Sequence, residues 1–254
     1  NISNSSFYKA GGRPWKLAFV RPGVCYLGLV FKRDDRDGDP KNACCAAQMF
    51  LDSGDGVVFR GAVGPWYSEV DHSFHLSYAA AKDLVQLAIS SYKKASFGEK
   101  PPSELFIHGK ITFGDEEWNG IVDAAGTATK VVGVKIRKGF GLKLYTRKIY
   151  PVLRGIAYVD RPVSGSLWTV GFTPRLQTYL GKESPNPINI EVCRGEADLG
   201  VVLSDIMSLT KLNYNACIFA DGQPVTLRFA DAVGEILTAG PPPGSSPLPF
   251  KYYI

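Results

Sequence analysis

An almost unbroken apolar run near the start of the chain constrains the fold most. Residues 24–31 read Val-Cys-Tyr-Leu-Gly-Leu-Val-Phe and contain no charged side chain. A strand with one solvated face alternates apolar and polar residues, whereas a strand covered on both faces is apolar throughout. The run, extended to Lys32, therefore predicts a central strand in a sheet that has other layers packed on both sides.

The segments that follow predict the rest of one large α/β domain, which suits a length of 254 residues. Ala43–Leu51 and Gly56–Val63 are strand-like and are separated by Asp-Ser-Gly-Asp, which predicts a hairpin. Ser73–Lys94 has apolar residues at helical spacing, and Pro101-Pro102 prevents any continuation. Further strands are expected at Leu105–His108, Val131–Ile136, Ile156–Val159, Leu167–Phe172 and Ile188–Val192, and helices at Asp115–Ala124, Ala197–Leu212 and Val225–Leu237.

This order of elements is that of an RNase H-like fold and is also compatible with other α/β folds. Three antiparallel strands come first, followed by a crossover helix, further parallel strands and C-terminal helices. The last fifteen residues contain Pro241-Pro242-Pro243-Gly244 and are expected to be irregular until the final Phe250–Ile254.

The distribution of charge is more informative than its total. The net charge is +5 and the pI is about 8.9, which alone does not indicate nucleic-acid binding. In two stretches, residues 1–33 and 124–159, the charged residues are all Lys or Arg, with no Asp or Glu. Such stretches suit a polyanion that releases counterions on binding, although solvated lysines on exposed strand faces would give the same pattern.

Cysteine and histidine usage gives no indication of a disulfide framework or a zinc site. The five cysteines include no Cys-x-x-Cys pair, and Cys25, Cys44 and Cys193 lie in apolar runs, where cysteine behaves as a small hydrophobe. His72 and His75 lack a convincing third metal ligand, so a capping or surface role is expected for them. No apolar run reaches the length of a membrane span and no signal pattern opens the chain, so a cytoplasmic location is expected.

Several short motifs resemble the Argonaute family. Tyr8-Lys-Ala-Gly-Gly-Arg-Pro-Trp-Lys16 resembles the passage from the MID domain into the PIWI domain, and Arg228–Gly234 and the closing Phe250–Ile254 resemble later PIWI segments. The resemblance implies an RNase H-like PIWI fold, with a mixed central sheet flanked by helices. Residues 1–23 would end the MID domain and its linker, and residues 24–254 would form PIWI, as the C-terminal part of a longer chain.

The same resemblance implies how a guide strand is held. Lys9 would contact the guide 5′-phosphate, and the terminal carboxylate of Ile254 would hold Mg²⁺ beside that phosphate. Lys211, Asn213 and Asn215 would contact guide phosphates. The alternatives are a surface lysine in a glycine turn, aromatic packing at the C-terminus and helix capping by the asparagines.

Cleaving members of the family place three or four acids around divalent metal ions. The first acid position is Val30 here, the second falls at His108-Gly109-Lys110, where Gly109 takes the acid position, and the last is kept as Asp231. One carboxylate cannot organise two metal ions, so loss of catalysis is expected. Acids in loops and at a helix start, such as Asp34, Asp35, Asp115 and Glu117, are better explained by solubility and capping.

The resemblance therefore implies a catalytically inactive prokaryotic Argonaute, of the short type that has MID and PIWI domains only. It would bind a guide RNA or DNA and a complementary target, with DNA favoured as the target. It would activate a TIR- or SIR2-type effector with an Argonaute-associated segment, in defence against plasmids or phage. An active nuclease with relocated carboxylates, an inactive long-type Argonaute and a scaffold that binds no nucleic acid remain alternatives.

Overall fold

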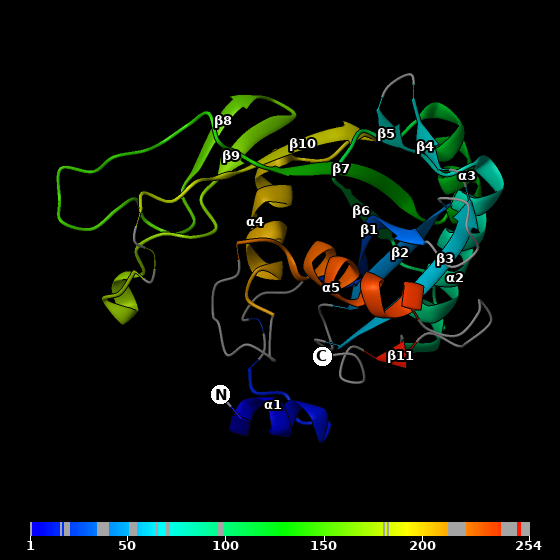
Figure 1. Cartoon of the computed structure of the whole chain (residues 1–254), viewed down its shortest axis with the longest axis horizontal. Coiled ribbons are helices and arrows are strands. Elements are labelled where there is room, and N and C mark those ends of the chain that lie inside the picture. Colours follow the sequence, from blue (N-terminus) through cyan, green and yellow to red (C-terminus); the bar gives the residue numbers. More distant parts are fainter. Residues whose placement is uncertain are drawn as a thin grey trace.

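The protein is built on one mixed sheet of nine strands in the order β11-β3-β2-β1-β6-β7-β10-β9-β8 (Figure 1). In the computed structural model, the described residues are 2–15, 17, 21–34, 41–50, 55–64, 66–69, 72–95, 99–179, 181, 183–212, 222–239 and 248–249. Within them, no helix combines the length and apolar character needed to cross a membrane.

The apolar run forms the middle of this sheet, as the sequence predicts. Strand β1 (Val24–Asp34) pairs in parallel with β6 (Glu104–Gly109), which pairs in parallel with β7 (Lys130–Lys138). On its other side β1 pairs antiparallel with β2 (Lys41–Phe50), and β2 forms the expected hairpin with β3 (Asp55–Gly64).

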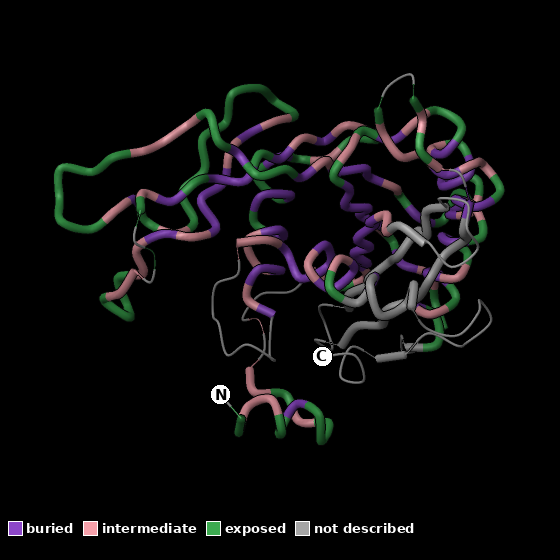
Figure 2. Tube along the Cα trace, viewed as in Figure 1, coloured by how far each residue is buried: buried purple, intermediate pink, exposed green. Residues whose placement is uncertain are grey.

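Side chains of β1 alternate between two separate cores. Val24, Tyr26 and Val30 pack with helices α4 (Leu199–Leu209) and α5 (Val225–Ala239). Cys25, Leu27 and Leu29 pack on the opposite face with α2 (Tyr78–Ala95) and α3 (Asp115–Ala125). Helices therefore cover both faces of the central strands, and Figure 2 shows that the buried residues gather there.

The strands of the second half correct one expectation, because they are not parallel. β10 (Ile188–Arg194) runs antiparallel to β7 and to β9 (Ser164–Leu167), and β9 runs antiparallel to β8 (Ala157–Arg161). Only a short turn joins β8 to β9, and a tight turn can join only antiparallel neighbours. β8 is the outer strand on this side, and all five of its residues are exposed.

The predicted strand Leu167–Phe172 is wrong except at its first residue. The apolar residues after Leu167 fill a core under an irregular segment instead of continuing the strand. Trp168 is fully buried and its indole Nε1 donates to the Pro185 carbonyl over 3.1 Å. The apolar pattern therefore reflects burial. In a run this short, the pattern alone cannot show whether a buried segment also pairs as a strand.

The predicted start of the long helix at Ser73 is also wrong. Ser73–Phe74 is strand β5, which pairs with β4 (Tyr67–Ser68), and the helix begins at Tyr78. Ser77 caps it, because its side-chain Oγ accepts from the Ala80 amide over 3.3 Å.

Both ends of the chain carry short elements that the sequence did not predict. Helix α1 (Ile2–Lys9) opens the chain, and β11 (Leu248–Pro249) pairs with β3 within the proline-rich tail that was expected to be irregular. A single turn of 3₁₀-helix, η1, covers Pro174–Leu176. The final strand expected at Phe250–Ile254 lies outside the described residues.

Candidate nucleic-acid interface

The carboxyl ends of the parallel strands β1 and β6 meet at one edge of the sheet. Gly28 of β1 lies level with His108 of β6, so Val30 and Lys32 continue past that level. Ligands of open α/β sheets bind outside the carboxyl ends of parallel strands. This edge is therefore a candidate position for a binding site.

Val30 and His108 are interior residues at this edge. Val30 is 3% exposed and belongs to the core beneath α5. The His108 imidazole is fully buried and its Nδ1 lies 3.0 Å from Thr226 Oγ1, and burial lowers its pKa to about 3. His108 is therefore neutral near pH 7 and serves as a packed polar residue.

Two lysines project at the same edge, one from each strand end. Lys32 lies two residues after Val30 and so shares its face of β1. Lys110 directly follows Gly109 at the end of β6. Lys32 Nζ lies 3.2 Å and Lys110 Nζ 3.1 Å from the same oxygen, Oδ1 of Asp231 on α5.

Asp231 is therefore a carboxylate held by two ammonium groups. Its partial burial alone would raise the pKa, but the hydrogen bonds and charges of Lys110 and Lys32 outweigh burial and lower the pKa below its ordinary value. The carboxylate is ionised at neutral pH, and the cluster of Lys32, Lys110 and Asp231 has a net charge of one positive unit.

An open groove of about 570 Å³ begins at this cluster, and within the described part of the chain four cations and one anion line it. The lining residues are Lys110, Ile136, Arg137, Lys138, Gly222, Gln223, Leu227, Arg228 and Asp231. Arg137 also fixes the wall, because its Nε donates to the Lys110 carbonyl over 2.7 Å. A groove of this charge suits a phosphate backbone.

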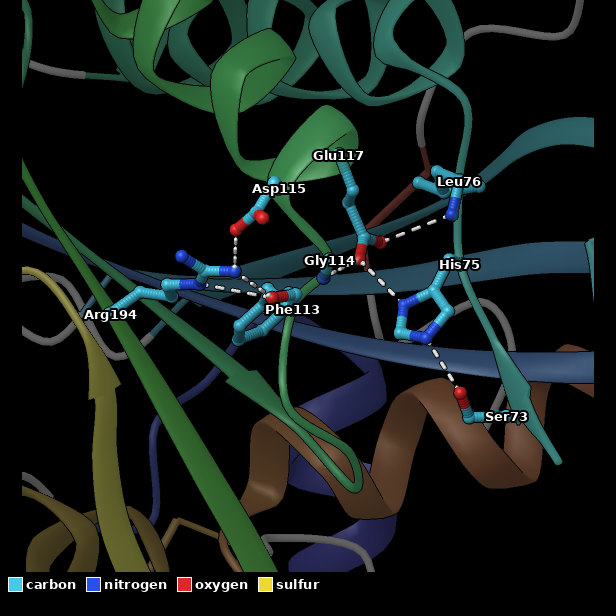
Figure 3. A network of polar contacts seen from close by, with 8 residues as sticks. All are labelled: Ser73, His75, Leu76, Phe113, Gly114, Asp115, Glu117 and Arg194. Carbon is cyan, nitrogen blue, oxygen red and sulfur yellow. Dashed lines mark hydrogen bonds and ion pairs between the residues drawn. The ribbon is translucent and has the colours of Figure 1, made fainter. Parts of the chain in front are cut away.

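The loop that carries Lys110 is anchored by a buried acid at the start of α3 (Figure 3). Glu117 is 2% exposed, and its carboxylate accepts from the amides of Gly114 and Leu76, each over 3.3 Å. His75 Nδ1 lies 3.4 Å from the same carboxylate, and His75 Nε2 lies 2.6 Å from Ser73 Oγ. Burial raises the pKa of Glu117 against these hydrogen bonds.

A second anchor comes from β10. Arg194 donates from Nε and from a terminal nitrogen to the Phe113 carbonyl, over 3.0 and 2.8 Å, and pairs with Asp115 (Figure 3). Asp115 and Glu117 are thus occupied in holding the loop and the helix end, as the sequence predicted for capping acids. Within the described part of the chain, no group of three or more His, Cys, Asp or Glu side chains could hold a metal ion.

No protein-family model matches the chain. The Argonaute of Aquifex aeolicus (strain VF5) is 23% identical over 259 residues, which cover 100% of this chain and 33% of that protein. Clostridium butyricum Argonaute bound to a guide DNA and a 19-mer target DNA has the same fold, with a TM-score of 0.71 at 17% identity over 93% of this chain and 30% of that chain.

The chain is homologous to the Argonaute proteins. A further solved structure, Marinitoga piezophila Argonaute in complex with a 5′-hydroxyl guide RNA, aligns with a TM-score of 0.68 at 15% identity over 100% of this chain and 35% of that one. The chain thus spans about a third of the length of the relatives it matches. The predicted RNase H-like PIWI fold of Argonaute is confirmed.

The residues predicted to hold the 5′-end and the backbone of an Argonaute guide are only partly described. Lys9 is exposed and is the last residue of α1. The turn after it needs glycine, because Gly11 has a φ of 96° and donates to the Tyr8 carbonyl while the Gly12 amide donates to the Phe7 carbonyl. Ile254, Asn213 and Asn215 lie outside the described residues.

The structure brings Trp15, which follows the Lys-Ala-Gly-Gly segment, into contact with the residues after α4. Trp15 Nε1 donates to the Lys211 carbonyl over 2.8 Å. The Lys211 side chain is partly buried, and this burial, together with the nearby charge of Arg154, lowers its pKa. Arg154 in turn donates to Thr210 Oγ1 over 2.9 Å. Two of the predicted guide-binding segments therefore adjoin one cationic region.

A pair of catalytic metal ions, as in cleaving Argonautes, does not fit the residues at the strand ends. Val30 and Gly109 offer no side-chain ligand atom, and the Asp231 carboxylate is already bound by two ammonium groups, which repel cations. The sequence identified these three positions but did not single out Lys32, Lys110 or Arg137 as binding groups. The available signal was the spacing of Lys32, which shares a strand face with Val30.

Proposed function

We propose that this protein binds a guide strand and a complementary nucleic acid target without cutting the target. The observation that carries the proposal is the cluster at the strand ends. Asp231 is held by Lys32 and Lys110, with contacts of 3.2 and 3.1 Å, while Val30 and Gly109 supply no carboxylate. A site with one neutralised acid has neither the ligands nor the charge to hold the metal ions of a cleaving site.

Charge and homology support the binding half of the proposal. Among the described residues, the groove beside the cluster carries Lys110, Arg137, Lys138 and Arg228 against the single acid Asp231. The C. butyricum and M. piezophila relatives are solved with guide strands, and the former also with a target DNA. Recognition of the target would come from base pairing to the guide, while the protein supplies shape and positive charge.

The 5′-end of the guide is assigned to Lys9 and the terminal carboxylate of Ile254 with Mg²⁺, and Lys211, Asn213 and Asn215 would contact the guide backbone. A magnesium ion suits that place because a carboxylate and a phosphate repel each other unless a cation lies between them. The contact between Trp15 and Lys211 supports a shared site, since it joins the two segments that carry these residues.

The cellular role proposed from family resemblance is prokaryotic defence. Target binding would activate an associated TIR- or SIR2-type effector that consumes NAD⁺ in response to plasmid or phage nucleic acid. This role is tested separately from binding, by measuring NAD⁺ in cells that carry the effector, with and without a plasmid that matches the guide.

The deciding experiment loads the full-length protein with 5′-phosphorylated or 5′-hydroxyl guides, DNA and RNA, in Mg²⁺. Both 5′-ends are needed because the M. piezophila relative was solved with a 5′-hydroxyl guide. The loaded complex is then incubated with labelled target in Mg²⁺ and in Mn²⁺. Tight binding of a matched target that stays uncut is expected.

Two results would contradict the proposal. Metal-dependent products of defined length, lost in Asp231→Ala, would show an active nuclease. Failure to bind guide or target at any salt concentration would indicate a scaffold that does not bind nucleic acid.

A further inference from the structure

We propose that the Lys32 and Lys110 ammonium groups bind a phosphodiester of the nucleic acid in the groove, at the place where cleaving relatives use metal ions. The inference rests on the proposed guide-directed binding and names the group that the strand-end cluster recognises. It makes this cluster a metal-independent phosphate site.

The geometry of the two lysines suits one phosphate. Both Nζ atoms contact Oδ1 of Asp231, at 3.2 and 3.1 Å, so they are at most about 6.3 Å apart, the sum of the two distances. Two non-bridging oxygens of one phosphodiester can accept from two donors at such a separation. Each ammonium carries three N–H donors, which suits it to contacts with more than one oxygen.

The cluster is reachable from the groove. The side chains of Lys110 and Asp231 are 49% and 45% exposed, and both line the groove, while that of Lys32 is 18% exposed. A phosphate approaching along the groove would therefore meet Lys110 first and Lys32 next.

The charge of the cluster also points to an anion. Two ammonium groups and one carboxylate leave one positive unit, which the single charge of a phosphodiester neutralises. A divalent cation would meet two like charges and find one carboxylate already engaged, whereas Mg²⁺ prefers several oxygen ligands. These residues do not suit a divalent metal ion, but they do suit an anionic ligand.

Neighbouring cations in the groove can contact further phosphates of the same strand. Arg137 and Lys138 of β7 and Arg228 of α5 line the same groove as Lys110 and Asp231. The bond from Arg137 Nε to the Lys110 carbonyl holds the lysine-bearing loop at the groove wall. Successive phosphates of one strand can therefore run from the cluster along the groove.

The first test measures target affinity of the guide-loaded, full-length protein, with and without EDTA, after guide retention has been verified in each condition. The variants are Lys32→Met and Lys110→Met, which keep the apolar stem and remove the charge. Each is expected to weaken target binding about three- to tenfold near physiological salt and to lower the salt slope by about one. Lys94→Met, an exposed lysine on α2 at the opposite face of the sheet, is the matched control and should change little.

Asp231→Asn gives the sharper result, because a phosphate site and a metal site predict opposite changes. The carboxylate competes with phosphate for both lysines, so its neutralisation should tighten target binding about threefold or more, equally in EDTA and Mg²⁺. Glu116→Gln, an exposed acid on α3, controls for the general loss of one negative charge.

A scan of the target with single neutral methylphosphonates then locates the contact. One or two positions should weaken binding to the wild-type protein but not to Lys110→Met, because the same contact cannot be lost twice.

The outcomes separate this inference from the proposed function. Failure to load guide or to bind matched target would overturn the proposed function and this inference with it. Normal loading and pairing, with lysine variants no weaker than Lys94→Met, would overturn the phosphate site alone. So would Mg²⁺-dependent target binding that is lost in Asp231→Asn.

Discussion

At the residue scale, the burial of His108 makes the stability of the fold depend on pH. Its pKa is lowered to about 3 by burial, whereas an unfolded histidine titrates near 6.5. The unfolded state therefore binds a proton that the folded state does not, and stability present above pH 6.5 is lost as the pH falls toward 3. Between pH 7.5 and pH 5 we expect a loss of about 2 kcal/mol in the free energy of unfolding from this residue.

Urea unfolding of the wild type and of His108→Gln at the two pH values tests this expectation, because the variant should lose about 2 kcal/mol less. His72→Asn is the matched control. His72 is exposed and has a φ of 51°, a conformation that asparagine tolerates, so this variant controls for the loss of a histidine outside the core. Parallel curves for wild type and His108→Gln would contradict the assignment.

Gly28 shows a second constraint on a single residue. A Cβ atom added there would lie 2.5 Å from the carbonyl of Thr226, because α5 crosses β1 at this point. Gly28→Ala should therefore cost about 1–3 kcal/mol in the free energy of unfolding, since either the backbone of α5 or β1 must shift. Gly141→Ala, where no atom lies within 4 Å of the added Cβ, should change stability by less than about 0.5 kcal/mol. Equal urea midpoints for the two variants would show that α5 moves at no cost.

At the element scale, the start of α3 depends on Glu117. Glu117→Ala would leave the amides of Gly114 and Leu76 without their carboxylate partner in a buried place, at a cost of about 2–4 kcal/mol. Glu116→Ala, in the same helical turn but exposed, should cost less than about 0.5 kcal/mol. Hydrogen exchange of the loop before α3 should accelerate only in the Glu117 variant, and protection equal to that of the wild type would count against the anchor.

The same elements show what the sequence could predict. The central strand, the hairpin and the helices α3 and α5 follow from long periodic or apolar runs and were confirmed. The start of α2 was misplaced because Ser73 and Phe74 pair with β4, a contact with a separate segment that local spacing does not report. The run after Leu167 was misread because it is buried without pairing.

The sequence predicted positions for the candidate site but not their arrangement in space. Resemblance pointed to Val30, Gly109 and Asp231, which lie far apart in the sequence. That two lysines meet Asp231 depends on how α5 crosses the ends of β1 and β6, and only the fold supplies that arrangement. The capping role predicted for the acids at the start of α3 needed no such knowledge, because a helix N-terminus favours acids wherever it lies.

At the scale of the whole molecule, one extension carries a surplus of positive charge. Residues 139–187 contain seven Lys and Arg and two Asp and Glu, a surplus of five. This segment, with β8 and β9, projects from one side of the molecule and is largely exposed along its length (Figures 1 and 2). Many exposed large apolar side chains also lie here, among them Phe140, Tyr145, Ile149, Tyr158 and Val159.

This concentration predicts where nonspecific affinity for nucleic acid resides. Replacing Arg147, Lys148 and Arg161 with Gln should weaken binding of any sequence to the same degree and lower the salt slope by about two to three. Replacing Lys93, Lys94 and Lys130, three exposed lysines outside the extension, removes the same formal charge and controls for it. The measurement is target affinity of guide-loaded protein between about 50 and 200 mM salt, the range over which phosphate contacts are most salt-sensitive. Equal salt slopes for the two triple variants would mean that total charge, and not the extension, governs the affinity. A salt slope that is reduced in the first variant alone would place phosphate contacts on the extension, outside the groove at the strand ends.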